Sequence, residues 1–349
     1  MRNTETLIYS ERDDFMIKVD IISGFLGAGK TTFIKELISK VYGDEKIVLI
    51  ENEFGEIGID GLFMKESGIE VTEMNSGCIC CTLVGDFSKA LKKVREEFSP
   101  DRIIIEPSGV GKLSDVARAV SDMRKEADAD IENLITIVDG TKAEMYMKNF
   151  GEFFNNQIEY ADTIVISRTQ KIDEKNLRKC VESIRTKNEK AAIVTTPWEE
   201  LSAEAIKEAL SRGRNFNLEI MERVDIMEIH EEDHDHSHHH HKENHDNEHH
   251  HDHEGHHHAD EVFDSWGTET VHKFSRSELE DILGLLSTTE SLGNVLRAKG
   301  IVEDENGRWV EFDMVPEETE IRERMPDYTG RVCVIGTHLN ERELNKIFR

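Results

Sequence analysis

A glycine-rich turn between an apolar run and a helical pattern constrains the fold of this chain more than any other feature. The apolar run covers residues 17–22, IKVDII, and the sequence from Gly24 to Thr32 reads GFLGAGKTT. A glycine, four residues and then Gly-Lys-Thr, placed after a strand and opening a helix, form a phosphate-binding loop. Its glycines let backbone N–H groups close around phosphates, and the helix N-terminus favours negative charge. The pattern therefore predicts a nucleotide-binding α/β unit.

The residues of this turn are expected to share two tasks. The Lys30 amine reaches the β- and γ-phosphates in such loops, and the Thr31 hydroxyl takes a Mg²⁺ position. The residues expected to bind the nucleotide through this turn are Gly24, Gly27, Ala28, Gly29, Lys30, Thr31 and Thr32.

Strand-like and helical stretches alternate after the turn. Near-continuous apolar strands separated by helices indicate a parallel sheet covered on both faces. We therefore expect a P-loop NTPase domain of α/β class with a mostly parallel sheet over residues 17–225, after an extension at residues 1–16. The expected strands are residues 17–22, 47–51, 102–106, 134–139, 163–167 and 192–195, and the helical patterns are residues 30–40, 86–97 and 113–124.

Two of these strands end in acidic residues that suit a phosphate and Mg²⁺ site. The run LIENEFG carries Glu51 and Glu53 and leads to Glu56, and such a loop can order around a γ-phosphate and relax after hydrolysis. A solvated acidic turn is the alternative. The run IIIEPSG ends in Glu106, which can hold Mg²⁺ directly or through water, and Gly109 can offer its N–H to the γ-phosphate. We expect Lys30, Thr31 and Glu106 to be the catalytic residues.

Three thiols lie within four residues at Cys78, Cys80 and Cys81. Thiolates at this spacing suit Zn²⁺ or another soft or borderline ion, and Glu51 or Glu56 could complete the ligand set. An iron–sulfur site, a redox pair and small core residues are the alternatives. Cys180, in a predicted helix, and Cys333, in an apolar strand, are expected in the core. Asp139, which ends an apolar strand, is expected to cap a helix N-terminus, and a site residue at the strand end is the alternative.

The chain changes character after residue 225. Fifteen of its 17 His lie between His230 and His258 among acidic residues, so residues 226–264 are expected to form a disordered linker that binds Zn²⁺, Ni²⁺ or Co²⁺ loosely. A solvated linker without a ligand role is the alternative. Residues 265–349 are expected to form a small α+β domain. Its predicted strands are residues 268–274, 293–302, 308–313 and 330–336, and its predicted helices are residues 277–286 and 340–348.

Composition limits the partners of the chain. Its 349 residues carry a formal charge of −29, which opposes binding to nucleic acid and to an anionic membrane surface. No apolar run approaches the length of a membrane span, and the first 16 residues lack the apolar core of a signal peptide. Clustered Cys in an odd total of five favours a reducing compartment. We therefore expect a soluble cytoplasmic protein.

The phosphate-binding loop, the ENEFG loop, the GCICC motif and the EPSG strand end, in this order, resemble the CobW-like metallochaperone GTPases. The stretches LRAKGIV, WVEFD and VCVIGTHLNEREL resemble the small C-terminal domain of that family. The resemblance implies binding of GTP and Mg²⁺, slow GTP hydrolysis, and a transition metal, Zn²⁺ or else Co²⁺ or Ni²⁺, at the cysteine motif. The metal would pass to a client metalloprotein or to a cofactor-synthesis enzyme, for example in cobalamin biosynthesis.

One motif departs from the family pattern. After the strand at residues 163–167 the family usually has Asn/Thr-Lys-x-Asp, which reads guanine, whereas this chain has Ser167, Arg168, Thr169 and Gln170. The neutral Gln170 loses a charge-assisted pair of hydrogen bonds, which costs on the order of 1–3 kcal/mol. The stem of Arg168 can still stack on the base. We expect GTP to remain the nucleotide.

Two other functions are compatible with the residues. A P-loop kinase or ATPase acting on a small molecule would use the cysteines only for structure. A His-rich metal store would not need an intact Lys30–Thr31 pair. No strong candidate for a general base follows from the sequence, so we expect a low intrinsic rate.

Overall fold

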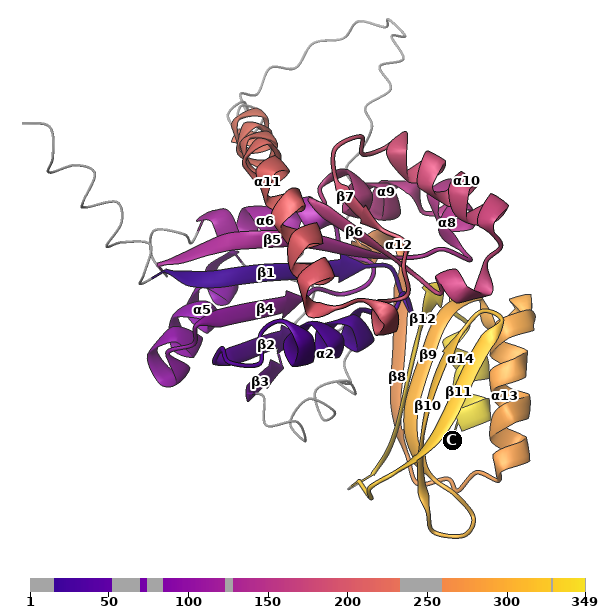
Figure 1. The fold of residues 1–349 in the computed structure, drawn as a ribbon. Coiled ribbons are helices and arrows are strands. Elements are labelled where there is room, and N and C mark those ends of the chain that lie inside the picture. The colour runs from indigo at the N-terminus through magenta and orange to yellow at the C-terminus, as the bar shows by residue number, and fades with distance from the viewer. Residues whose placement is uncertain are drawn as a thin grey trace, which may run out of the picture.

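The computed structural model describes residues 16–51, 70–73, 84–122, 128–232, 259–327 and 329–348. Within these residues, two sheets account for all the strands (Figure 1). Among the described residues, no helix is long and apolar enough to cross a membrane.

The N-terminal sheet has seven strands in the order β3-β2-β4-β1-β5-β6-β7, and every neighbouring pair is parallel. Their apolar side chains explain the burial: β2, β4 and β6 are buried along their whole length. This parallel sheet confirms the predicted P-loop NTPase fold. The strands are β1 (Ile17–Gly24), β2 (Ile47–Glu51), β3 (Glu70–Glu73), β4 (Arg102–Glu106), β5 (Ala129–Asp139), β6 (Thr163–Ser167) and β7 (Ala192–Val194).

Helices cover both faces of this sheet (Figure 1). On one face α2 packs through Phe33, Ile34 and Leu37, and on the other α6 and α9 bury their apolar sides. The helices of this unit are α2 (Lys30–Lys40), α5 (Val84–Phe98), α6 (Leu113–Asp122), α8 (Ala143–Asn149), α9 (Gly151–Glu159), α10 (Glu174–Arg185) and α11 (Ala203–Glu232), with short 3-10 turns η1 (Thr169–Lys171) and η2 (Trp198–Glu200).

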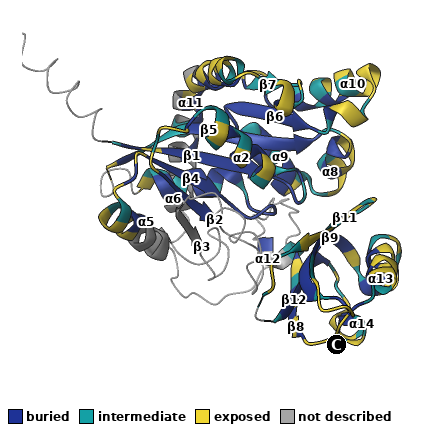
Figure 2. Ribbon diagram, turned by 60° about the horizontal axis from the view of Figure 1, so that its bottom comes forward, coloured by how far each residue is buried: buried dark blue, intermediate teal, exposed yellow. Residues whose placement is uncertain are grey.

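The second sheet is antiparallel, with the order β11-β10-β9-β12-β8. Two helices bury their apolar faces against one side of it, and Figure 2 shows the dark blue, buried positions between them. This α+β arrangement agrees with the predicted C-terminal fold. Its elements are α12 (Ala259–Val262), β8 (Asp264–Thr270), α13 (Arg276–Thr288), η3 (Glu290–Leu292), β9 (Asn294–Glu303), β10 (Trp309–Val315), β11 (Glu318–Arg324), β12 (Gly330–Thr337) and α14 (Glu341–Phe348).

The two sheets share one apolar cluster. Phe263, directly after α12, is buried and its ring centroid lies 6.2 Å from Phe25, 5.7 Å from Phe150 and 5.1 Å from Phe153. Leu296 and other apolar residues of the C-terminal sheet belong to the same cluster. Because Phe25 is part of the glycine-rich turn, this packing fixes the C-terminal sheet beside the predicted phosphate site.

The structure corrects several sequence predictions. The strand expected at residues 268–274 is Asp264–Thr270, because Phe274 instead leads into the Ser275 capping box that begins α13. Strand β11 was not predicted, because its sequence ETEIRER is a mostly exposed edge strand without an apolar alternation. The predicted linker is too long at both ends: α11 continues to Glu232, and α12 with the buried Phe263 precedes residue 264. Residues 233–258, which hold most of the His tract, lie outside the described residues.

Candidate nucleotide site at the strand edge

The phosphate-binding turn leaves β1 at the edge where β4 also ends. Strands β1 and β4 are parallel neighbours with Ile21 paired to Ile105, so Gly24 and Glu106 emerge from the same side of the sheet. Gly27 and Gly29 have φ angles of 66° and 98°, a region in which a side chain is strained. These glycines turn the chain into α2, whose first residue is Lys30. The N-terminus of α2 therefore faces the turn and favours an anion there.

Lys30, Thr31 and Glu106, which the sequence predicts to be catalytic, lie together. The Lys30 amine is buried, donates to the Gly24 carbonyl oxygen at 3.0 Å, and lies 3.9 Å from a Glu106 oxygen. The Thr31 hydroxyl donates to the Glu106 carboxylate, with oxygen–oxygen distances of 3.2 Å and 3.3 Å. Hydroxyl and carboxylate oxygens are the hard ligands that Mg²⁺ takes, so these residues fit the predicted ion.

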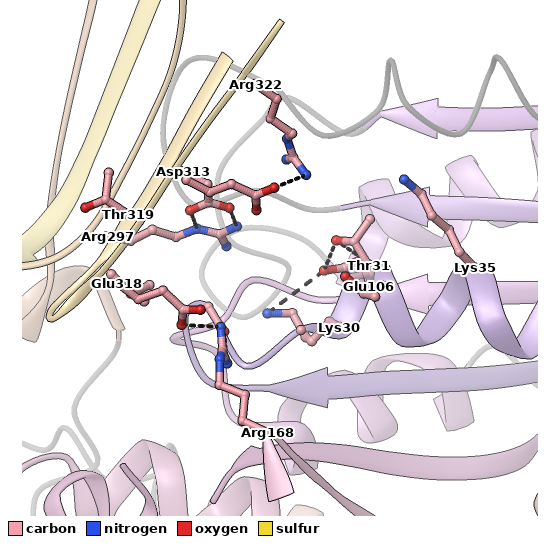
Figure 3. A pocket seen from close by; sticks show the side chains of 15 residues that line it. Lys30, Thr31, Lys35, Glu106, Arg168, Arg297, Asp313, Glu318, Thr319 and Arg322 are labelled. Atoms are coloured by element: carbon pink, nitrogen blue, oxygen red, sulfur yellow. Dashed lines mark hydrogen bonds and ion pairs between the residues drawn. The ribbon is translucent and has the colours of Figure 1, made fainter. Parts of the chain in front are cut away.

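A cavity of about 320 Å³ opens above this cluster. Figure 3 shows its two sides: the turn and α2 form one, and strands of the C-terminal sheet form the other. The sequence did not predict that the C-terminal sheet forms one side of this cavity. The C-terminal residues that line the cavity are Arg297, Asp313, Val315, Glu318, Thr319, Glu320 and Arg322.

A second cavity of about 190 Å³ adjoins the loop after β6. The loop residues Ser167, Arg168 and Gln170 line it, together with Gly29 and Thr32 of the phosphate turn. It therefore lies where the sequence placed recognition of the nucleotide base. Pro197 and Trp198, which the sequence did not single out, also line this cavity.

Hydrogen bonds and ion pairs hold the Arg168 side chain beside the second cavity. Its guanidinium donates to the Gly27 carbonyl oxygen at 2.8 Å and to Asp139 Oδ2 at 2.9 Å, and a second nitrogen lies 2.9 Å from Glu318 Oε2. Asp139 also accepts from the backbone N–H and hydroxyl of Thr141. The prediction that Asp139 caps a helix is wrong, because Lys142 precedes α8 and Asp139 instead binds the turn and Arg168.

The remaining predicted nucleotide ligands lie on the same edge. Ala28 is buried within the turn, and Gly109 packs so closely on Leu26 that an added Cβ would lie 2.9 Å from the Leu26 nitrogen. The Gly109 carbonyl accepts a hydrogen bond from Gln157. Whether the Gly109 N–H binds a γ-phosphate stays a prediction.

The predicted metal ligands are only partly described. Glu51 is buried at the end of β2 and pairs in register with Glu106 of β4. Glu56, Cys78, Cys80 and Cys81 lie outside the described residues, and among the described ones no group of three His, Cys, Asp or Glu is arranged to hold a metal. Cys180 and Cys333 are buried, as predicted. Burial raises the pKa of the Cys180 thiol to about 11, which disfavours the thiolate that a metal needs.

Comparison with known families decides the membership of the chain. The nucleotide-binding domain model of CobW/HypB/UreG matches residues 18–195, just over half of the chain, and the C-terminal domain model of cobalamin synthesis protein cobW matches residues 263–349. The chain belongs to the CobW/HypB/UreG family. This membership agrees with the resemblance found in the sequence motifs, and it confirms that the N-terminal unit is a nucleotide-binding domain.

Individual members of the CobW/HypB/UreG family are moderately similar to the chain. The zinc chaperone CobW of Sinorhizobium sp is 32% identical in an alignment over 252 residues that covers 63% of this chain and 70% of the relative. The zinc chaperone YeiR of Escherichia coli (strain K12) is 32% identical over 45% of this chain and 48% of its own length. The zinc-regulated GTPase metalloprotein activator 1 of Schizosaccharomyces pombe is 27% identical over 52% of this chain. The chain spans about half the length of these last two relatives.

Among solved structures, the crystal structure of Zn(II)-bound YjiA GTPase from E. coli aligns with 95% of this chain and 98% of its own. The alignment has a TM-score of 0.41 and 22% sequence identity.

Proposed function

We propose that this CobW/HypB/UreG protein is a nucleotide-gated metallochaperone. It binds and slowly hydrolyses GTP, and it carries a transition-metal ion at Cys78, Cys80 and Cys81 to a client metalloprotein or a cofactor-synthesis enzyme. The names of the relatives favour Zn²⁺ as the cargo, with Co²⁺ and Ni²⁺ as the other ions that such ligands accept. Because the cysteines must stay reduced to bind metal, we place this activity in the cytoplasm.

The observation that carries the proposal is the shared edge of three parallel strands. Strands β2, β3 and β4 are neighbours in parallel register, with Glu51 paired to Glu106 and to Glu73. The three strands therefore end at one edge of the sheet. In the sequence, the glutamate loop follows β2, the cysteine motif follows β3, and Glu106 ends β4. Cys78 follows Glu73 by five residues, so the chain can reach no farther than about 18 Å from the strand end.

The nucleotide steps use residues of the described site. The Lys30 amine and the turn amides hold the phosphates, and the Lys30 contacts with Gly24 and Glu106 position the amine for this task. The Thr31 hydroxyl and the Glu106 carboxylate would hold Mg²⁺. When bound, Mg²⁺ would neutralise negative charge on the phosphates.

Coupling to the metal requires a change in affinity between nucleotide states. A nucleotide shifts an equilibrium only by as much as it binds one state more tightly than the other. Glu51 ends β2 beside Glu106, and it leads directly to Glu53 and Glu56 of the predicted loop. We propose that this connection couples the two sites, so that GTP binding and hydrolysis beside Glu106 change the metal affinity of the cysteine site.

Cobalt titration of the full chain tests this function. Co²⁺ bound to thiolate has an intense absorption band that Co²⁺ on His or carboxylate lacks, so the His tract does not obscure the cysteine site. We expect one thiolate-bound Co²⁺ whose affinity differs between a non-hydrolysable GTP analogue and GDP. The matched control replaces all three residues, Cys78→Ser, Cys80→Ser and Cys81→Ser, which should remove the band.

Three outcomes are informative. A band that responds to nucleotide supports the gated chaperone. A band with equal affinity in both states refutes gating but leaves a metal site. No thiolate band in any state refutes the chaperone and favours a P-loop enzyme that acts on a small molecule.

A further inference from the structure

The turn between β10 and β11 presses against the phosphate-binding turn. An added Cβ on Gly27 would lie 2.2 Å from Val315 Cγ1, so these two segments are in direct contact. The Pro316 carbonyl accepts from the Lys142 amine at 2.6 Å, which ties the same turn to the start of α8. The C-terminal sheet therefore reaches the nucleotide site through a short segment, Val315 to Glu318.

Glu318 is the charged residue of this segment that bridges to the loop after β6. One carboxylate oxygen lies 2.9 Å from the Arg168 guanidinium, and the other accepts from the Lys171 amine at 2.8 Å. Gln170, the residue in the position where the family has its guanine-reading aspartate, lies between these two cations in sequence. Glu318 therefore holds both ends of the loop segment that carries Gln170.

Arg168 carries this contact to the phosphate turn. The same guanidinium that binds Glu318 donates to the Gly27 carbonyl oxygen at 2.8 Å. Arg168 has a φ angle of 56°, a backbone conformation that a non-glycine residue adopts only when its surroundings hold it there. Its three acceptors, from the turn, from β5 and from the C-terminal sheet, supply those surroundings.

Charge keeps the bridge intact at neutral pH. Burial alone would favour the neutral acid, but the hydrogen bond from Lys171 and the charge of Arg168 outweigh it and lower the pKa of Glu318 below its ordinary value. The carboxylate is therefore ionised wherever the protein is folded near neutrality. Glu318 also lines both the 320 Å³ and the 190 Å³ cavities.

We propose that Glu318 is a positioning residue of the nucleotide site, supplied by the C-terminal sheet and acting through Arg168. It orients Arg168 against Gly27 and sets the position of the Gln170 loop, so that tight nucleotide binding requires the C-terminal sheet in its docked place. By linkage, a bound nucleotide stabilises the docked sheet to the same extent. This inference rests on the proposed GTP binding.

The test is nucleotide affinity, measured by titration with a fluorescent GDP analogue and by competition with unlabelled GTP, in the full chain. We expect Glu318→Gln to weaken binding about tenfold, because it removes charge from two charge-assisted contacts that are partly exposed. Glu318→Asp should restore part of the affinity. The matched control is Glu317→Gln, because Glu317 is exposed on the same turn.

A merely structural ion pair would behave differently. It would lower the fraction of folded protein and hence the apparent kcat, whereas the positioning role raises Kd and KM and leaves kcat within about twofold. A double-mutant cycle with Arg168→Gln further separates the positioning role from a merely structural ion pair. If Glu318 acts through Arg168, then Glu318→Gln changes affinity less than about twofold in the Arg168→Gln background.

The outcomes separate this inference from the proposed function. If the wild-type chain binds no GTP, both fail. If the wild type binds GTP and Glu318→Gln binds it equally tightly, the inference alone fails. It also fails if the two substitutions act additively, or if Glu317→Gln weakens binding as much as Glu318→Gln does.

Discussion

The Thr31 hydroxyl lies 3.2 Å and 3.3 Å from the two carboxylate oxygens of Glu106, although the residues are 75 positions apart. The contact follows from the sheet, because β1 and β4 are parallel neighbours and end on the same edge. A divalent ion that binds both groups has to replace this hydrogen bond. Thr31 and Glu106 therefore form a pre-arranged pair of oxygen ligands.

Replacing Glu106 with Gln should weaken Mg²⁺ dependence more than nucleotide binding. The neutral amide keeps the size of the side chain and an acceptor for Thr31, but it removes the negative charge. We expect GTP hydrolysis at fixed, limiting Mg²⁺ to fall about 10- to 100-fold, with recovery toward the wild-type rate as Mg²⁺ is raised. Glu144→Gln, at a half-exposed ion pair with Lys179, is the control. An unchanged Mg²⁺ dependence would show that Glu106 does not approach the ion.

The phosphate site was predictable because its signals are local. The spacing of Gly24, Gly29, Lys30 and Thr31 fixes a strand, a turn and a helix within ten residues. Glu106 was predictable because an apolar run that ends in an acid places that acid at the carboxyl edge of a parallel sheet. The strand runs at residues 47–51, 102–106 and 163–167 agree with the observed strands residue for residue.

The C-terminal side of the site was not predictable for a physical reason. Its contact between Gly27 and Val315 joins segments almost 290 residues apart, and nothing in either segment encodes the partner. Glu318 and Arg322 lie in an edge strand whose charges read as a solvated face. Only the docking of the two sheets around Phe263 shows that these charges line a cavity. The same docking places Glu318 against Arg168 and Lys171, the two cations that flank Gln170 in the sequence.

We expect a substitution in the C-terminal sheet to restore only part of the nucleotide affinity that Gly27→Ala loses. Gly27→Ala adds a Cβ at a φ of 66° and brings it 2.2 Å from Val315 Cγ1. The strain of the positive φ costs about 1–2 kcal/mol, and the clash adds to it. We expect GDP affinity to fall at least tenfold. Val315→Ala in the same chain should recover the part that comes from the clash, and Val315→Ala alone should change affinity little. No recovery in the double variant would mean that the contact does not limit binding.

Arg102, at the opposite edge of the sheet, should matter for stability and not for nucleotide binding. It is almost fully buried and lies 2.7 Å from Asp20, 2.6 Å from Glu45 and 2.7 Å from Glu132. Arg102→Met leaves Asp20 buried without its cation, which costs about 3–5 kcal/mol of unfolding free energy. Arg95→Met, at an exposed pair with Asp128, should cost less than about 1 kcal/mol. Urea unfolding followed by circular dichroism measures both, and equal losses would contradict the assignment.

Asp162 should make the protein less stable as the pH rises from about 4 to 7. Burial raises the pKa of Asp162 from its ordinary 3.8 to about 7 in the folded chain, against the hydrogen bond that it accepts from the Leu134 N–H. Between these pH values the unfolded chain has released this proton and the folded chain has kept it. The unfolded state then binds fewer protons, so the unfolding free energy falls with pH and levels off above about 7.

Asp162→Asn isolates this contribution, because its side-chain oxygen can still accept from Leu134 and it does not titrate. A tenfold change in proton affinity is worth about 1.4 kcal/mol, so the wild type should lose on the order of 4 kcal/mol relative to Asp162→Asn across this range. Urea unfolding of both proteins at pH 5, 6, 7 and 8 measures the difference. We expect Asp162→Asn to gain stability relative to the wild type at each step up to pH 7, with only a small further gain at pH 8. Parallel pH profiles for the two proteins would show that Asp162 is ionised in the folded chain throughout.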